Sequence, residues 1–401
     1  MASDMGARNR GPRDLLLAFS IAAIALATLI PRDGDGTQSL SMCLLCGQRG
    51  LGDFLSNILL FVPFGFALRR RGWPLLRVVR VGAAASLTIE LAQLGLITGR
   101  DPNAGDLLAN TLGALVGGLV MEKRSFWRPA AVNPWRAVGL AAGMSTLLLG
   151  ALSLFTPYEP DAEQFAVQLA PARPDMDSYL ANVHYVRIGD TLLDTTAAIR
   201  LSSDVLLENA LEVQAEKDVP PRLAPIVTVH DERGRELLML GAAREDLVYR
   251  QRMRADELRL DRGDIRVHQA FEFVPPGAMY SLRLRVDRTG YCLELEDRVA
   301  CGRGFTVGDT WSLLLALDWG SDERAVLRAL WLFILFIPPG LPARRRRDTA
   351  AAATIAGGLL MSGTLLLGFA PTPAYQVIAV WAGILTGRQY GKRWRTTEEQ
   401  P

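Results

Sequence analysis

The sequence predicts an all-α membrane bundle of about eight transmembrane helices, with an all-β sandwich inserted outside the membrane. Of the 401 residues, 49% are hydrophobic and the mean hydropathy is +0.16, which is too apolar for a single soluble domain. Apolar runs of membrane-spanning length lie on both sides of a polar segment, in which the apolar residues alternate. We therefore expect three domains: five helices at 1–156, the β-sandwich at 157–322 and three helices at 323–401.

Eight apolar runs each approach the length of about 20 residues that a transmembrane helix needs. The first follows Arg8, Arg10 and Arg13, as a signal peptide would, but no small-x-small cleavage pattern follows it. We therefore interpret it as an uncleaved helix. The runs are residues 14–30, 53–69, 81–98, 104–121, 136–156, 326–342, 350–369 and 372–387.

The basic residues predict the orientation of these helices, because short loops rich in arginine and lysine stay in the cytoplasm. Basic clusters occupy every second helix boundary, whereas the intervening loops carry only Arg32, Arg49 and Arg100. We expect a protein of the inner (plasma) membrane with both termini in the cytoplasm and segment 157–322 outside. The clusters are residues 8–13, 69–80, 123–136, 344–347 and 388–395.

The polar segment shows the alternation of half-buried strands, separated by turn signals at hairpin spacing. Its pattern resembles, weakly, a concanavalin-like or laminin-G-like jelly roll. A carbohydrate- or partner-binding surface is the default expectation for this segment. No Ser-His-Asp order or spaced carboxylate pair indicates a hydrolase. The predicted strands include 210–215, 226–230, 270–274 and 281–286, and the turns include 232–235, 275–277 and 288–290.

Four cysteines form two close pairs. Cys292 and Cys301 flank a predicted hairpin, which favours a disulfide, and two buried free thiols are the alternative. Cys43 and Cys46 form a lone CxxC in the first outside loop. A loop disulfide is our interpretation of this pair, and a redox-active pair or a partial metal site remains open.

Polar side chains recur inside three of the early apolar runs, at spacings that place each pair on one helix face. Such residues are costly in hydrocarbon, so they are candidates for ligand binding unless they hydrogen-bond between helices. Under the predicted orientation all of them lie in the outer leaflet, with Glu90 near the midplane, and Asp53 could instead cap its helix. We call these residues the polar set: Asp53, Asn57, Glu90, Gln93, Arg100, Asp106 and Asn110.

Three segments carry a recognisable motif: DFLSNILLFVPFG (53–65), TIELAQ (88–93) and RDPNAGDLLANTLG (100–113). Together they resemble the VanZ-like family of membrane proteins, over residues 13–122. The resemblance implies a helical scaffold, and the family's namesake is associated with low-level tolerance of the glycopeptide teicoplanin, with no established reaction. Pro63 and Gly65, and the glycines at 113, 117 and 118, fit close helix packing.

Three functions fit these features. The first is binding of a membrane lipid or lipid-linked glycan precursor in an outward-facing pocket, with the sandwich contacting carbohydrate or an envelope protein. The second is an enzyme acting on such a lipid, with Glu90 or Asp106 as general base and Arg100 on a phosphate. The third, transport, is disfavoured because we find no inverted repeat.

Other function classes are excluded by charge and histidine content. The formal net charge is only +2 and the arginines are grouped, so we expect no nucleic-acid partner. His184, His230 and His268 are too far apart in sequence for a ligand pair at helical or finger spacing. We therefore expect no metal site and no cofactor.

Overall fold

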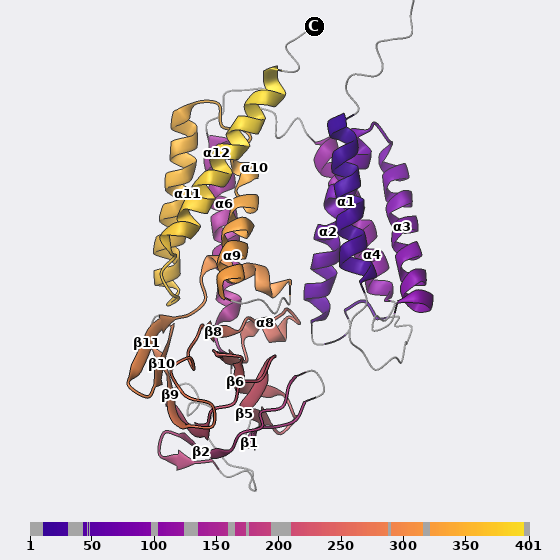
Figure 1. Cartoon of the computed structure of the whole chain (residues 1–401). Helices are drawn as coiled ribbons and strands as arrows, with labels where there is room; N and C mark the ends of the chain where they lie inside the picture. Colours follow the sequence, from indigo (N-terminus) through magenta and orange to yellow (C-terminus); the bar gives the residue numbers. More distant parts are fainter. Residues whose placement is uncertain are drawn as a thin grey trace, which may run out of the picture. The chain divides into compact units, whose positions relative to one another are not determined.

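The computed structural model describes residues 11–30, 43–45, 47, 49–97, 103–123, 135–158, 165–173, 176–193, 210–287, 290–315 and 321–396. It divides into two compact units, Met1–Val132 with Leu258–Asp261 and Asn133–Glu257 with Arg262–Pro401 (Figure 1). Each unit is described separately below. The three-domain division predicted from the sequence stays a prediction.

The first unit is a helical bundle of α1 (Gly11–Leu29), α2 (Gly50–Arg70), α3 (Leu75–Leu96) and α4 (Ala104–Glu122). Its apolar core joins Leu17 of α1 to Phe61 and Phe64 of α2 and Val78 of α3. Large apolar side chains also point outward, and Leu91 is 60% exposed. An apolar outer surface of this kind suits a lipid environment.

Glycines bring α2 and α4 into backbone contact. A Cβ placed at Gly117 would lie 2.0 Å from the Val62 carbonyl oxygen, and one at Gly65 would lie 2.0 Å from the Ala114 oxygen. No side chain fits in that space, so the packing predicted for these glycines is confirmed. Gly118 instead faces the Leu75 side chain, with 2.7 Å from the built Cβ to its Cδ1.

The second unit contains the long helices α6, α9, α11 and α12, the short helix α10 and two 3₁₀ turns, η1 after α6 and η2 before α9. Among them, α6 packs against α11, and α12 packs against α9 and α10. Their bounds are α6 (Trp135–Leu152), η1 (Ser153–Phe155), η2 (Val307–Leu313), α9 (Ser321–Leu335), α10 (Ile337–Gly340), α11 (Arg346–Leu366) and α12 (Ala374–Thr396).

Four helices in the described part of the chain are long and apolar enough to cross a membrane: Gly50–Arg70, Ala104–Glu122, Trp135–Phe155 and Arg346–Leu366. The predicted number of about eight spans is therefore not supported. Helices do form in all eight predicted ranges, but α9 has only 15 residues. Charged residues interrupt others: α3 carries two arginines and a glutamate, and the last turns of α12 are basic.

The β domain of the second unit consists of two antiparallel sheets with orders β1-β5-β6-β7-β8 and β11-β10-β9-β4-β2-β3. Tyr249 of β7 and Tyr291 of β10 join the sheets, with ring centroids 5.1 Å apart. The strands are β1 (Phe165–Leu169), β2 (Val183–Ile188), β3 (Thr191–Leu192), β4 (Leu211–Glu216), β5 (Ala224–Asp231), β6 (Glu236–Ala243), β7 (Asp246–Gln251), β8 (Ile265–Val267), β9 (Met279–Asp287), β10 (Gly290–Leu295) and β11 (Arg298–Arg303). A short helix, α8 (Arg254–Glu257), precedes β8.

The strand predictions at 210–215, 226–230 and 281–286 are confirmed by β4, β5 and β9, and the turns at 232–235 and 275–277 also form. The prediction at 270–274 is wrong, because this segment is a turn. Its carbonyls at Phe271 and Val274 each accept a hydrogen bond from the buried Lys217 ammonium, at 2.7 Å. Turn residues 288–289 lie outside the described residues, and a concanavalin-like fold is not confirmed.

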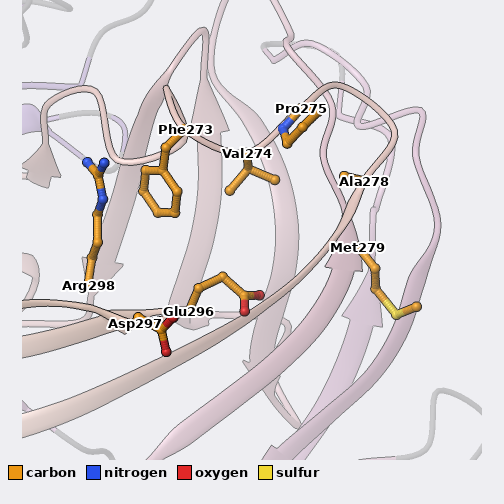
Figure 2. A pocket seen from close by; sticks show the side chains of 8 residues that line it. All are labelled: Phe273, Val274, Pro275, Ala278, Met279, Glu296, Asp297 and Arg298. Atoms are coloured by element: carbon orange, nitrogen blue, oxygen red, sulfur yellow. The ribbon is translucent and has the colours of Figure 1, made fainter.

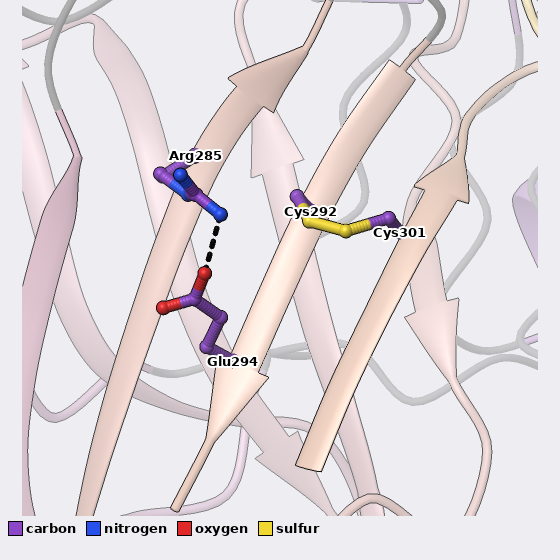
Figure 3. Close-up of a disulfide and its surroundings, with 4 residues drawn as sticks. All are labelled: Arg285, Cys292, Glu294 and Cys301. Carbon is purple, nitrogen blue, oxygen red and sulfur yellow. Dashed lines mark hydrogen bonds and ion pairs between the residues drawn. A yellow bond between two sulfur atoms is a disulfide. The ribbon is translucent and has the colours of Figure 1, made fainter. Parts of the chain in front are cut away.

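The predicted disulfide between Cys292 and Cys301 is present and joins β10 to β11 (Figure 3). Beside it, Arg285 on β9 forms an ion pair with Glu294 on β10. Covalent and ionic links therefore hold neighbouring strands at this end of the six-stranded sheet. Cys46 lies outside the described residues, so its pairing with Cys43 stays a prediction.

Candidate functional site

Glu90 is the buried carboxylate of the polar set. It lies on α3, is 8% exposed, and its Oε2 accepts a hydrogen bond from the Asn103 backbone N–H at 2.8 Å. Asn103 is the N-cap of α4, and its Oδ1 accepts from the Gly105 N–H at 2.9 Å. The carboxylate therefore meets the first turn of α4, where backbone N–H groups and the helix dipole favour a negative or hydrogen-bond-accepting group.

Asn110 lies deeper on α4 and is 1% exposed. Its Nδ2 donates to Ser86 Oγ on α3 at 2.9 Å. Its Oδ1 is buried and has no hydrogen-bond partner within the described part of the structure. An unsatisfied buried acceptor costs about 1–3 kcal/mol, so this oxygen is a place where an additional donor would be stabilised.

Gln93 has a different role. Its Nε2 donates to the Thr28 carbonyl oxygen at 2.9 Å, which ties the C-terminal end of α3 to the C-terminal end of α1. For this residue the alternative interpretation, hydrogen bonding between helices, is supported.

The remaining members lie nearer the helix ends. The Asp53 side chain is 56% exposed, and Asp53 Oδ1 is 3.6 Å from Arg49 Nη2. Arg49 is the N-cap residue of α2 and no side chain caps that helix, so Asp53 does not act as its cap. Asn57 and Asp106 are half-buried, and Asp106 lies in the first turn of α4. Arg100 lies outside the described residues.

The carboxylates do not assemble into a metal site. No group of three histidine, cysteine, aspartate or glutamate residues with metal-binding geometry occurs in the segments that the structure describes. This includes Asp53, Glu90 and Asp106, the set that a divalent ion would have required.

Comparison with known proteins agrees with the motif. Residues 16–126 match the model of the VanZ/LLP1 family. The VanZ-like segment contains every member of the polar set, and it covers less than a third of the chain. No curated protein and no solved structure matches.

Hydrogen-bond partners of the polar set were missed from the sequence, among them Ser86, Thr28 and Asn103. Ser86 is four residues before Glu90 and shares its helix face, which is a signal that the motif itself contains. Thr28 contributes only a backbone carbonyl, which no residue type can reveal.

The β domain contains a shallow pocket of about 390 Å³ (Figure 2). The Arg298 guanidinium lies 3.9 Å from the centre of the Phe273 ring, and Glu296 Oε1 accepts from the Ser281 N–H at 2.5 Å. The lining mixes an aromatic ring, apolar side chains and charged groups. It consists of Phe273, Val274, Pro275, Ala278, Met279, Glu296, Asp297 and Arg298.

Proposed function

We propose that this protein is a multi-pass inner-membrane protein of the cell envelope whose VanZ-like segment binds the polar headgroup of a membrane lipid or lipid-linked glycan. The observation that carries the proposal is the unsatisfied Oδ1 of Asn110, buried on the helix face that also holds Asp106. Charged side chains in hydrocarbon cost about 2.5–3.5 kcal/mol at insertion, and hydrogen bonding between helices leaves the Asn110 Oδ1 without a partner among the described residues.

The pocket opens to the outside in this proposal. The basic clusters at 69–80 and 123–136 favour a cytoplasmic position for the Arg70 end of α2 and the Glu122 end of α4. Asp53 and Asp106, at the opposite ends of these helices, then face the outer leaflet. The Cys292–Cys301 disulfide supports an extracytoplasmic β domain, because disulfides persist in oxidising compartments. A reporter fused at residue 240 should be active outside, and cytoplasmic activity contradicts this orientation.

Lipid binding is tested by native mass spectrometry of the purified protein. Glu90→Gln removes the charge at nearly constant volume, and Arg100→Ala removes the arginine of the motif. Thr88→Ala is the matched control. Thr88 is exposed on α3, the helix that carries Glu90, and its hydroxyl donates to the Ala84 carbonyl of that helix. We expect a lipid bound to the wild type and to Thr88→Ala, and lost from the other two variants. Equal lipid in all four proteins would show that the polar set only joins helices.

An alternative is a membrane-embedded enzyme that acts on the same lipid, with the buried Glu90 or Asp106 as general base and Arg100 on a phosphate. Turnover of a co-purified lipid separates this alternative from binding. The pocket beside Phe273 fits contact with carbohydrate or an envelope partner, since aromatic and charged groups lie together there. A contribution to glycopeptide tolerance follows if the bound lipid carries an envelope precursor.

A further inference from the structure

Helices α9 to α12 carry a sequence pattern already seen in α2 to α4. Residues 60–65 read LFVPFG and residues 335–340 read LFIPPG, and each is followed by an arginine run, at 69–71 and 344–347. The last helix of each set carries two glycines four residues apart, Gly113 and Gly117 in α4 and Gly383 and Gly387 in α12. The order of these features is the same in both sets, as in a direct repeat.

The two sets also pack in the same way. Each of the three glycine contacts between α2 and α4 has a counterpart between α12 and the α9–α10 pair, made to the residue at the matching position. The distances from the built Cβ to the carbonyl oxygen are 2.3 Å for Gly113 to Ile58 and Gly383 to Phe333, 2.0 Å for Gly117 to Val62 and Gly387 to Ile337, and 2.0 Å for Gly65 to Ala114 and Gly340 to Ile384.

The middle helices match as well. Buried residues recur at every turn of α3, and the same spacing recurs in α11. The matched buried positions are Val78 with Ala352, Gly82 with Ala356, Ser86 with Leu360 and Glu90 with Thr364.

The buried polar residues of the first set are changed in the second. The hydrogen-bonded pair Ser86 and Asn110 is replaced by Leu360 and Val380, both fully buried. Glu90 is replaced by Thr364, whose hydroxyl donates to the Leu360 carbonyl of its own helix at 3.0 Å. The second set therefore keeps the packing residues, replaces the hydrogen-bonded pair by apolar residues and replaces the buried carboxylate by an uncharged threonine.

The chain itself occupies the outer end of the second set. Arg328, at the position of Asp53, donates through Nε to Asp309 Oδ1 at 2.6 Å. Gln376, at the position of Asp106, accepts from the Gly308 N–H at 3.1 Å and donates to Thr306 Oγ1 at 2.8 Å. Arg328 and Gln376 thus bind the segment Thr306–Asp309, in which Asp309 supplies a carboxylate.

We infer that α9 to α12 are a second copy of the VanZ-like helices in which apolar residues replace the pair Ser86 and Asn110, and that Asp53 and Asp106 in the first copy contact the primary amine of a zwitterionic lipid headgroup. The inference rests on the proposed function and adds the ligand chemistry. A guanidinium that binds a carboxylate in the second copy is replaced by a carboxylate in the first, so the complementary group changes from anion to cation. Arg49 near Asp53 forms an exposed ion pair of little strength.

The test measures which lipid the full-length protein retains from nanodiscs that contain equal phosphatidylethanolamine and phosphatidylglycerol. Asp53→Asn and Asp106→Asn each remove one carboxylate. Glu122→Gln is the matched control, because Glu122 ends α4 on the opposite side and also lies 3.6 Å from an arginine, Arg69. We expect a preference for phosphatidylethanolamine that falls about tenfold in the Asp106 variant, less in the Asp53 variant and not in the control, as loss of a charge-assisted hydrogen bond predicts.

The outcomes separate the two proposals. Bound lipid with no preference, or a preference that both aspartate variants keep, overturns the amine assignment and leaves lipid binding standing. Absence of any retained lipid overturns both. Arg328→Met tests the second copy: hydrogen exchange at Val307–Leu313 should rise while the lipid preference stays unchanged. Unchanged hydrogen exchange at Val307–Leu313 would contradict the proposal that Arg328 holds this segment at the outer end of the second copy.

Discussion

Replacing Asn110 by valine, the residue at the matching position of the second copy, separates a binding role from a structural one. The change keeps the side-chain volume nearly constant and removes the unsatisfied Oδ1, whose burial costs about 1–3 kcal/mol. It also removes the bond to Ser86, and hydrogen bonds between membrane helices contribute about 0.6 kcal/mol on average. The Ser86 hydroxyl can then donate to the carbonyl one turn earlier, as Thr88 does to Ala84.

The net expectation for Asn110→Val is a gain of about 1 kcal/mol in the free energy of unfolding, or roughly 2–4 °C in Tm, with loss of the bound lipid. Thermal unfolding and native mass spectrometry of the same preparation measure both. Gln93→Leu should change Tm in the opposite direction. It removes the hydrogen bond from Gln93 Nε2 to the Thr28 carbonyl and leaves that carbonyl without this donor, so Tm should fall. A lower Tm for Asn110→Val with unchanged lipid retention would refute the binding role.

Three further predictions concern stability. Gly117→Ala forces a Cβ to 2.0 Å from Val62 O and should cost about 1–3 kcal/mol, whereas Gly143→Ala, with nothing within 4 Å, should be neutral or stabilising in the same thermal assay. Reduction of the Cys292 disulfide should lower the stability of the β domain by about 2–3 kcal/mol in denaturant titration, and no change would contradict a structural role. Burial raises the pKa of Asp231, but hydrogen bonds from Arg235 outweigh it and hold the pKa below its usual value, so the stabilisation is present near neutral pH and is lost as pH falls through the folded-state pKa. Asp231→Asn should therefore destabilise at pH 7 and have little effect at pH 2, and a pH-independent loss would exclude this linkage.

Part of the fold could be predicted because it follows local pattern. Alternation placed β4, β5 and β9, and the hairpin between Cys292 and Cys301 forms as expected. The segment 270–274 also alternates, yet it is a turn, because its carbonyls bind the Lys217 ammonium at the end of β4. That contact joins residues more than fifty positions apart, so no local pattern reveals it.

The predicted number of membrane spans was not supported, for a related reason. Apolar runs predict where helices form, and each run does contain a helix, but the ends of α3, α9 and α12 are charged. Hydropathy averaged over a run does not show where the helix begins and ends.

For the candidate site, the residues of the polar set could be identified from the sequence. Polar residues at helical spacing in an apolar run are rare, so they attract notice. The partners Thr28 and Asn103 could not be identified, since each acts through its backbone. The direct repeat is faint in the sequence, because LFIPPG, the arginine run and glycines such as Gly387 persist in the second copy while apolar residues such as Val380 replace the motif's polar ones.

The most direct test of lipid binding is an experimental structure of the protein in nanodiscs that contain its co-purified lipid. The prediction is a headgroup whose donor lies about 2.7–3.2 Å from Asn110 Oδ1, with Asp106 on the same ligand. An Asn110 whose Oδ1 is satisfied by a neighbouring helix, in a bundle with no headgroup between α3 and α4, would contradict it.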